Sequence, residues 1–115
     1  MVDDKLSVAA VLAAVPVRDL DTAGDFYERL LGAPASDSPM PGLAQWDLGG
    51  GVLQVVVDAT RAGGGLVTLT FDDLSAAAEA VQRRGVDLQV DDGEVVTAVA
   101  RVLDPDGNSI TLVQP

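Results

Sequence analysis

The sequence predicts an α+β fold of two consecutive modules in a tandem βαβββ arrangement. The first module has a strand, a helix and two or three strands, and the second has a strand, a helix and three strands. Three observations support this prediction. A helical pattern at residues 17–32 returns at residues 71–85, an apolar run of strand character precedes each copy, and short apolar runs separated by turn residues follow it. Repetition of one supersecondary unit indicates that the two units pack against each other. We therefore expect a single domain with one module at about 7–60 and a second at about 65–115.

Residues Ser7–Val17 are expected to form the first strand, buried on both faces because alanine and valine dominate the run. Pro16 near its end is unsuited to a helix interior. The first helix is expected over Asp21–Leu31, where Asp21 or Thr22 can accept from free N–H groups of the first turn. Gly32 can take the left-handed conformation that ends a helix. The apolar stripe of this helix comprises Ala23, Phe26, Tyr27, Leu30 and Leu31.

The rest of the first module is expected to be a loop followed by a hairpin. Ala33–Pro41 holds three prolines, which disfavour regular structure. Leu43–Leu48 and Val52–Asp58 have strand character, and the three glycines between them are typical of a hairpin turn. These glycines lack the lysine and the following helix of a phosphate-binding loop. The segment RAGGG at residues 61–65 predicts a flexible connection between the modules.

The second module repeats the pattern. A strand is expected at Leu66–Phe71, followed by a helix that starts at Asp73 or Ser75 and ends at Gly85. Its apolar stripe comprises Leu74, Ala77, Ala78 and Val81. Three strands are then expected at Val86–Val90, Glu94–Leu103 and Ser109–Val113, separated by an acidic turn at 91–94 and by the turn signal DPDGN at 104–108.

Strand alternation assigns side chains to the two faces of the sheet. Val96, Ala98, Ala100 and Val102 share one apolar face, and Thr97, Val99 and Arg101 share the other. In the last strand Ile110 and Leu112 point one way, whereas Ser109, Thr111 and Val113 point the opposite way. We expect the helices to cover the apolar faces, so that the other faces line a cleft.

Composition narrows the classes of function. The formal net charge of −11 would repel phosphate backbones, so we expect no nucleic acid partner. The chain has no cysteine, which excludes a disulfide framework. Its N-terminal apolar run is too short to span a bilayer and lacks the basic flank of a signal peptide, so we expect a cytoplasmic protein with no membrane partner.

Four segments together resemble the vicinal oxygen chelate superfamily of glyoxalases, bleomycin resistance proteins and extradiol dioxygenases. They are VPVRDL, AGDFYERLLG, FDDLSAAAEAVQRRG and DPDGNSITLVQ, in the order typical of the family, and the similarity extends over about residues 8–114. The resemblance implies two βαβββ modules that form an open, curled mixed sheet around a pocket, with the helices outside. It also implies a homodimer.

Enzymes of this family usually hold a divalent metal at four positions, two in each module. The resemblance places these positions at Leu12, Gln54, Leu66 and Thr111. Divalent metals in such sites need imidazole or carboxylate ligands, and the chain contains no histidine. We therefore expect no metal and no other cofactor. It follows that we do not expect this chain to catalyse the metal-dependent reactions of the family.

Three further side chains have alternative interpretations. Trp46 is either a stacking platform for a ligand or a core residue under a helix. Arg101, expected on the cleft face, is either a clamp for an anionic group of a ligand or one half of an ion pair at the rim. Asp47 is the one carboxylate near a cleft-lining strand, and its orientation decides whether it reaches the cleft.

The first hypothesis for the function is a metal-free small-molecule-binding protein of the glyoxalase/bleomycin-resistance type, which sequesters a drug or metabolite. Its expected ligand-binding residues are Leu12, Trp46, Gln54, Leu66, Thr68, Thr97, Arg101 and Thr111. A second hypothesis is an enzyme, either a glyoxalase-like isomerase or a metal-free catalyst using Asp47 or Arg101. A third is a non-catalytic interaction module whose cleft is filled by its own side chains.

Overall fold

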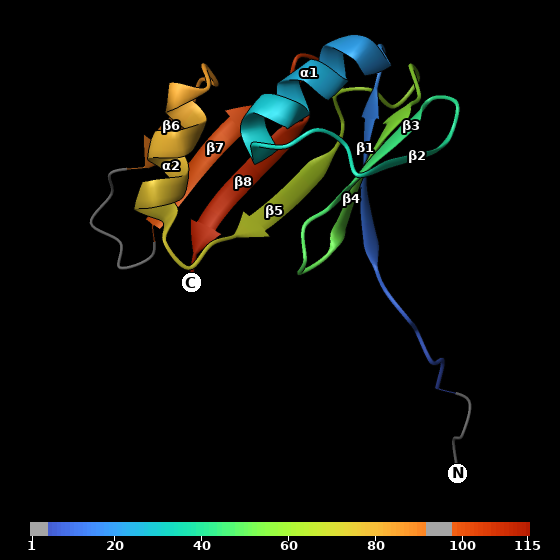
Figure 1. Ribbon diagram of the computed structural model, residues 1–115, viewed down its shortest axis with the longest axis horizontal. Coiled ribbons are helices and arrows are strands. Elements are labelled where there is room, and N and C mark those ends of the chain that lie inside the picture. Colours follow the sequence, from blue (N-terminus) through green and yellow to red (C-terminus); the bar gives the residue numbers. More distant parts are fainter. Residues whose placement is uncertain (1–4, 92–97) are drawn as a thin grey trace.

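The computed structural model describes residues 5–91 and 98–115, which form two open four-stranded sheets and two helices (Figure 1). The strand orders are β1-β4-β3-β2 and β5-β8-β7-β6, and each sheet has one parallel pair, β1 with β4 and β5 with β8. The tandem βαβββ prediction is therefore confirmed. The elements are β1 (Leu12–Val17), α1 (Leu20–Leu31), β2 (Asp37–Met40), β3 (Leu43–Asp47), β4 (Val52–Val57), β5 (Leu66–Thr70), α2 (Leu74–Arg83), β6 (Gln89–Asp91), β7 (Ala98–Leu103) and β8 (Ser109–Gln114).

Each helix begins at an aspartate that caps its first turn. The Asp19 carboxylate accepts from the Thr22 backbone N–H at 3.2 Å, and the Asp73 carboxylate accepts from the Ala76 N–H at 3.0 Å. The expectation of an Asp21 or Thr22 cap was wrong: the helix already begins at Leu20, so Asp19 is the residue whose side chain can accept from the free N–H groups of the first turn. Hydrogen bonds from Thr22 lower the pKa of Asp19.

The two helices end as expected, and their ends touch each other. Gly32 has φ of 78° and closes α1, while Gly85 with φ of 84° follows α2. The Arg84 side chain at the end of α2 donates from Nε to the Arg29 carbonyl and from Nη2 to the Leu30 carbonyl, the latter at 3.1 Å. Arg84 thus satisfies carbonyl groups that helix α1 leaves free at its C-terminus.

The first strand is shorter and more exposed than predicted. β1 begins at Leu12, where it pairs with Val52 at the start of β4, so in the described part of the chain residues 7–11 have no partner strand. Val15 and Val17 are fully buried, whereas Leu12 and the residues before it are exposed. Figure 1 shows this segment running away from the two sheets as an N-terminal arm.

Two other segments differ from their sequence predictions. The predicted loop 33–41 contains the edge strand β2, which accommodates Pro39 because an edge strand tolerates a residue without an N–H. The predicted strand Val86–Val90 is replaced by the shorter β6, which starts at Gln89. The acidic turn after Asp91, Thr97 and the first part of the predicted strand Glu94–Leu103 lie outside the described residues.

The core lies between the helices and one face of each sheet. Tyr27 on α1 is fully buried, its ring meets Phe26 edge to face at 5.1 Å between centroids, and it lies 6.1 Å from the Trp46 ring. The expected stripe of α1 is buried at Ala23, Phe26, Tyr27 and Leu30, while Leu31 is half-buried. In the described part of the chain, no helix is both long and apolar enough to cross a membrane.

A buried carboxylate joins the DPDGN turn to the first module. Asp104 is 4% exposed and accepts from the Tyr27 hydroxyl, from the Asn108 side-chain amide and from two backbone N–H groups, at 2.8–2.9 Å. Asn108 donates in turn to the Pro16 carbonyl at 2.7 Å and accepts from the Gly65 N–H at 2.7 Å. These contacts hold the two modules together.

The connection RAGGG is part of this junction and is not the flexible linker that its glycines suggest. Gly63 has φ of 91°, and a Cβ there would lie 2.5 Å from the Asp106 carbonyl oxygen. The Gly64 N–H donates to the Arg61 carbonyl, and the Ser109 N–H donates to the Gly65 carbonyl. The glycines therefore serve close packing against the DPDGN turn.

We predict that Tyr27→Phe lowers the free energy of unfolding by about 1–2 kcal/mol, because the Asp104 carboxylate loses one buried donor. Burial and the hydrogen bond to Asp104 raise the pKa of Tyr27 well above its usual range. Folded protein then keeps the phenol proton to higher pH than unfolded chain, so this stabilisation is complete below about pH 10 and falls above it. Urea unfolding at about pH 8 and about pH 11 measures both effects.

Tyr27 is the only tyrosine of the chain. Any stability that is lost at high pH through ionisation of a phenol therefore comes from this residue. The Phe variant should therefore lose less stability than the wild type between the two pH values. Equal losses in the two proteins would contradict this assignment.

We also predict that Gly63→Ala destabilises the protein by at least about 1–2 kcal/mol, from the positive φ alone, with the clash at Asp106 in addition. Gly50→Ala is the matched control, because a Cβ at Gly50 meets nothing within 4 Å and its φ is not positive. Thermal unfolding of both variants measures the difference. Similar melting temperatures would mean that the connection yields without cost.

Candidate functional site

Each sheet has one face that neither α1 nor α2 covers. In β1, β3 and β4 the residues that alternate with the buried positions are Leu12, Ala14, Pro16, Leu43, Gln45, Asp47, Val52, Gln54 and Val56. In β5, β7 and β8 they are Leu66, Thr68, Thr70, Val99, Arg101, Leu103, Ser109, Thr111 and Val113. We call these two surfaces the first and the second uncovered face. Both are half-buried or exposed, in contrast to the faces under α1 and α2.

The structure brings most of the expected ligand-binding residues onto these two faces. Thr68 is paired with Thr111, and Thr111 is paired with Arg101, so the three lie in one row across the second uncovered face. Leu66 flanks that row and is 83% exposed. Gln54 lies in the middle of the first uncovered face. Their role as ligand contacts stays a prediction.

Trp46 lies on the opposite side of its sheet from Gln54. Its side chain is 3% exposed, packs beside Tyr27, and donates from Nε1 to the Ala33 carbonyl at 2.9 Å. The core interpretation therefore describes its position, and the uncovered face presents its neighbours Gln45 and Asp47 instead. Alternation alone could not decide this, because both phases of so short a strand place an apolar residue inside.

The two uncovered faces repeat the same geometry. Leu12 pairs with Val52, two residues before Gln54, and Leu66 pairs with Ser109, two residues before Thr111. In each module a leucine of the first strand therefore lies diagonally opposite a polar side chain of the last strand. This equivalence supports the assignment of these four residues to corresponding positions of the two modules.

The donor set at these four positions does not fit a divalent metal. Leu12 and Leu66 offer only hydrocarbon, and the hydroxyl of Thr111 is a weak ligand. The Gln54 amide already donates to the Gln45 side-chain oxygen at 2.6 Å. Among the described residues, no three histidine, cysteine, aspartate or glutamate side chains gather where they could hold a metal ion. The uncovered faces therefore offer hydrogen bonding and apolar contact.

Gln45 was missed by sequence reasoning. It lies directly across from Gln54, and the pair forms a polar centre within a mainly apolar surface. The alternation of LAQWD contains the signal, because Gln45 and Asp47 share a face. The Asp47 carboxylate is exposed and accepts from the Gly49 N–H at 3.0 Å, so it supports the turn of the hairpin.

Arg101 is exposed on the second uncovered face, opposite Gln89 of β6. The alternative expectation, an ion pair with an aspartate at the cleft rim, stays a prediction, because residues 92–97 lie outside the described residues. Polar groups in the same row are Gln89 on one side of Arg101, and Thr111 followed by Thr68 on the other. This row can bind a ligand group that accepts hydrogen bonds.

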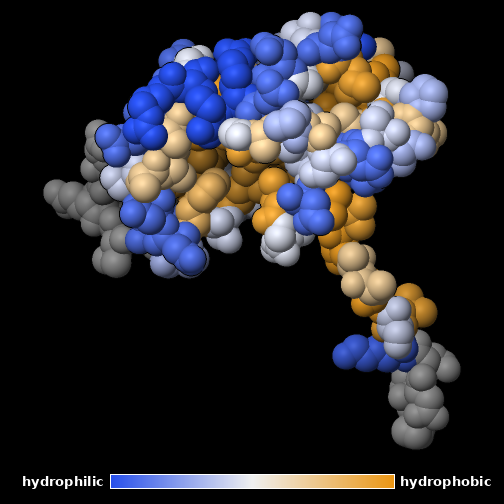
Figure 2. All heavy atoms as spheres, in the orientation of Figure 1, coloured by the Kyte–Doolittle hydropathy of each residue, from blue (hydrophilic) through white to orange (hydrophobic). Residues whose placement is uncertain are grey.

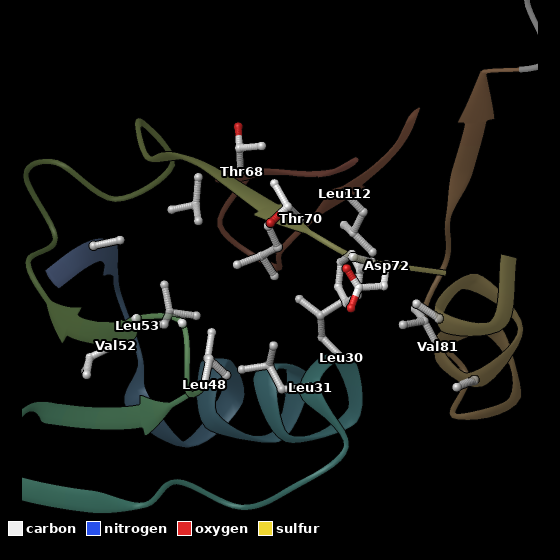
Figure 3. Close-up of a pocket in the computed structure, with 18 of the residues that line it drawn as sticks. Leu30, Leu31, Leu48, Val52, Leu53, Thr68, Thr70, Asp72, Val81 and Leu112 are labelled. Carbon is white, nitrogen blue, oxygen red and sulfur yellow. The ribbon is translucent and has the colours of Figure 1, made fainter. Parts of the chain in front are cut away.

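A pocket of a different kind lies between the two modules, mainly on the side of the helices (Figure 3). Its walls include Leu30, Leu31, Leu48, Leu69 and Val81, which no sequence pattern had grouped together. A pocket between elements that are distant in sequence leaves no local signal. Its volume is about 640 Å³.

Comparison with known proteins agrees with the fold and with the order of its motifs. The model of the glyoxalase/bleomycin resistance protein/dioxygenase superfamily matches residues 9–112. A glyoxalase/bleomycin resistance protein from Catenulispora acidiphila is 30% identical with a TM-score of 0.87, over 92% of this chain and 97% of that one. No match was found among curated protein sequences.

Two other solved structures are similar. An antibiotic-binding protein from a Streptomyces species is 29% identical with a TM-score of 0.78, over 96% of this chain and 99% of that one. A bleomycin-binding protein complexed with bleomycin shares the fold, with 23% identity and a TM-score of 0.75 over 95% of this chain and 99% of that one. The match to the family model over residues 9–112 shows that this chain belongs to the glyoxalase/bleomycin resistance protein/dioxygenase superfamily.

Proposed function

We propose that this protein binds and sequesters a small organic molecule, without a metal, on the uncovered faces of its sheets. The observation that carries the proposal is the repeated pair of a leucine and a polar side chain, Leu12 with Gln54 and Leu66 with Thr111. The family resemblance assigns these residues to the positions that hold a metal in enzymes. Such pairs supply apolar contact and a hydrogen bond, which is what a binding site needs.

Similarity to an antibiotic-binding protein supports the same class of function. That relative is 29% identical over almost the whole of both chains. We infer that the ligand here is an amphipathic molecule of antibiotic size, with apolar parts against the leucines and acceptor groups at Thr68, Thr111 and Arg101. Gln45 and Gln54 offer a second polar contact on the first uncovered face.

We further propose that two copies of the chain cover these faces. Leu66 and Leu103 are 83% and 63% exposed, and Leu6, Val8 and Val11 on the N-terminal arm are 66–81% exposed. Isolated exposed apolar residues are common, but a row of them on an extended arm and an uncovered sheet is typical of an interface. A second copy would convert an open face into an enclosed site.

The test of ligand binding is equilibrium dialysis with metal-free bleomycin and a panel of amphipathic antibiotics, followed by variants against the best binder. We predict that Thr111→Val and Gln54→Leu each weaken its binding by about tenfold, the usual consequence of one lost buried hydrogen bond. Thr60→Val is the control, because Thr60 lies in the exposed turn after β4. Unchanged affinity in both site variants would place the ligand elsewhere.

Metal titration tests the other half of the proposal. We predict that Zn²⁺, Mn²⁺ and Ni²⁺ leave the melting temperature unchanged in chelator-treated protein. A metal bound only by folded protein at 100 times its Kd would add about 2.7 kcal/mol to the free energy of unfolding, which such a scan detects readily. One chelator-removable metal per chain in elemental analysis would instead favour the enzyme hypothesis.

A further inference from the structure

The pocket between the modules differs in chemistry from the uncovered faces and lies mainly on the other side of the sheets, although Val52, Thr68 and Thr70 border both. It lies on the side of the sheets that carries the helices, below the C-terminal turn of α1 and beside α2. Figure 3 shows Leu30, Leu31 and Leu48 approaching it from the first module and Val81 and Leu112 from the second. We call it the intermodule pocket. Figure 2 shows apolar atoms gathered in a recess on this side of the molecule.

The walls of the intermodule pocket are held in place by the core. Leu53, Val81 and Leu112 are at most 3% exposed and belong to the hydrophobic core. Leu69 is half-buried, and Leu48 is 39% exposed at the hairpin that forms the rim. Because the buried side chains cannot rotate freely into the space, the protein alone does not fill it. A volume of about 640 Å³ is in the range of sites for drug-sized ligands.

Charged groups at the intermodule pocket favour a cation. Asp72 and Arg84 are the charged side chains that line it. The Arg84 guanidinium is directed to the last carbonyls of α1, to which it donates two hydrogen bonds, so the negative end of that helix offsets its charge. Asp72 is exposed in the segment between β5 and α2, and the whole chain has a net charge of −11. The Asp72 carboxylate and the negative net charge of the chain both attract positively charged ligands.

We propose that the intermodule pocket binds a second small molecule, a compact aromatic or aliphatic body carrying one amine cation. The hydrocarbon body lies among Leu30, Leu48, Leu69 and Val81, and the ammonium group lies at the Asp72 carboxylate. This site shares Thr68 with the ligand site proposed for the uncovered faces and is otherwise separate from it. It requires no contact with Arg101, Thr111 or Gln54.

Three fluorescent probes of one shape test the proposal: aminomethylanthracene, which is cationic, hydroxymethylanthracene, which is neutral, and anthracene carboxylate. We expect affinity to fall in that order in fluorescence titrations. Asp72→Asn should lower the affinity for the cationic probe by about threefold to tenfold and leave the affinity for the neutral probe unchanged. Asp87→Asn, which removes an exposed carboxylate away from the pocket, is the charge control. Equal binding of the three probes would overturn the proposed ligand class.

Two further variants locate the bound probe. Ala80 on α2 lines the pocket, so the larger side chain of Ala80→Leu should fill part of it. The affinity for every probe that binds should then fall by about tenfold or more. Ala76→Leu makes the same change on the exposed side of the helix and should have no effect. Leu48→Ala removes apolar contact at the rim and should also weaken binding, which keeps the test valid if Ala80→Leu fails to fold. Thermal unfolding checks each variant.

Two results would overturn the location. One is equal probe affinity in Ala80→Leu, Leu48→Ala and the wild type. The other is weaker probe binding in Thr111→Val, which would place the probe on the second uncovered face. Probe binding that disappears as the chain concentration rises would also overturn the proposal, because residues 5–11 of a second copy would then fill the pocket.

Discussion

The carboxylate of Asp104 is the point at which the two halves of this protein meet. It is almost completely buried, and a buried carboxylate is costly unless donors surround it. Here the Tyr27 hydroxyl, the Asn108 amide and two backbone N–H groups satisfy it. One donor comes from the helix of the first module and the others from a turn of the second. Removing any of them would leave the charge less well solvated.

This junction determines how the remaining elements sit. Asn108 extends the network to the Pro16 carbonyl and to the Gly65 N–H, which brings the end of β1 beside the start of β5. An ion pair between Arg18 and Asp106 at 3.1 Å adds a partly exposed contact at the same place. At the far end of α1, Arg84 binds the last carbonyl groups of the helix. Helix α1 is thus held by the second module at its middle and at its C-terminus.

Two different surfaces follow from that arrangement. The helices cover one face of each sheet and leave the other uncovered, with hydroxyl, amide and guanidinium groups among leucines and valines. Between the modules, the helix side encloses a mostly hydrocarbon pocket with Asp72 at its edge. In the family framework, the uncovered faces carry the positions that hold a metal in enzymes. Leucine at the two of those positions that the resemblance assigns to Leu12 and Leu66 offers hydrocarbon and no metal-binding atom.

Sequence periodicity was sufficient for the features that depend on near neighbours. The repeat of Asp19-Leu20 at Asp73-Leu74 revealed the two modules, and alternation correctly placed Arg101 and Thr111 on one face. The helix stripes and the glycine at the end of α1 were also predicted correctly. Each of these follows from interactions across three or four residues or between adjacent strands, which a local pattern records.

Contacts between distant residues were decided by the tertiary structure alone. Tyr27 and Asp104 are separated by 77 positions, and Asn108 and Pro16 by 92, so no spacing indicated that a turn aspartate would be buried. The packing of Trp46 under α1, the exposure of Leu12 and the intermodule pocket have the same origin. The sequence by itself determined the two modules, both helices with their apolar stripes and most of the strands, because these depend on local spacing. How far those faces are buried depends on which other elements reach them, and only the folded chain determines that.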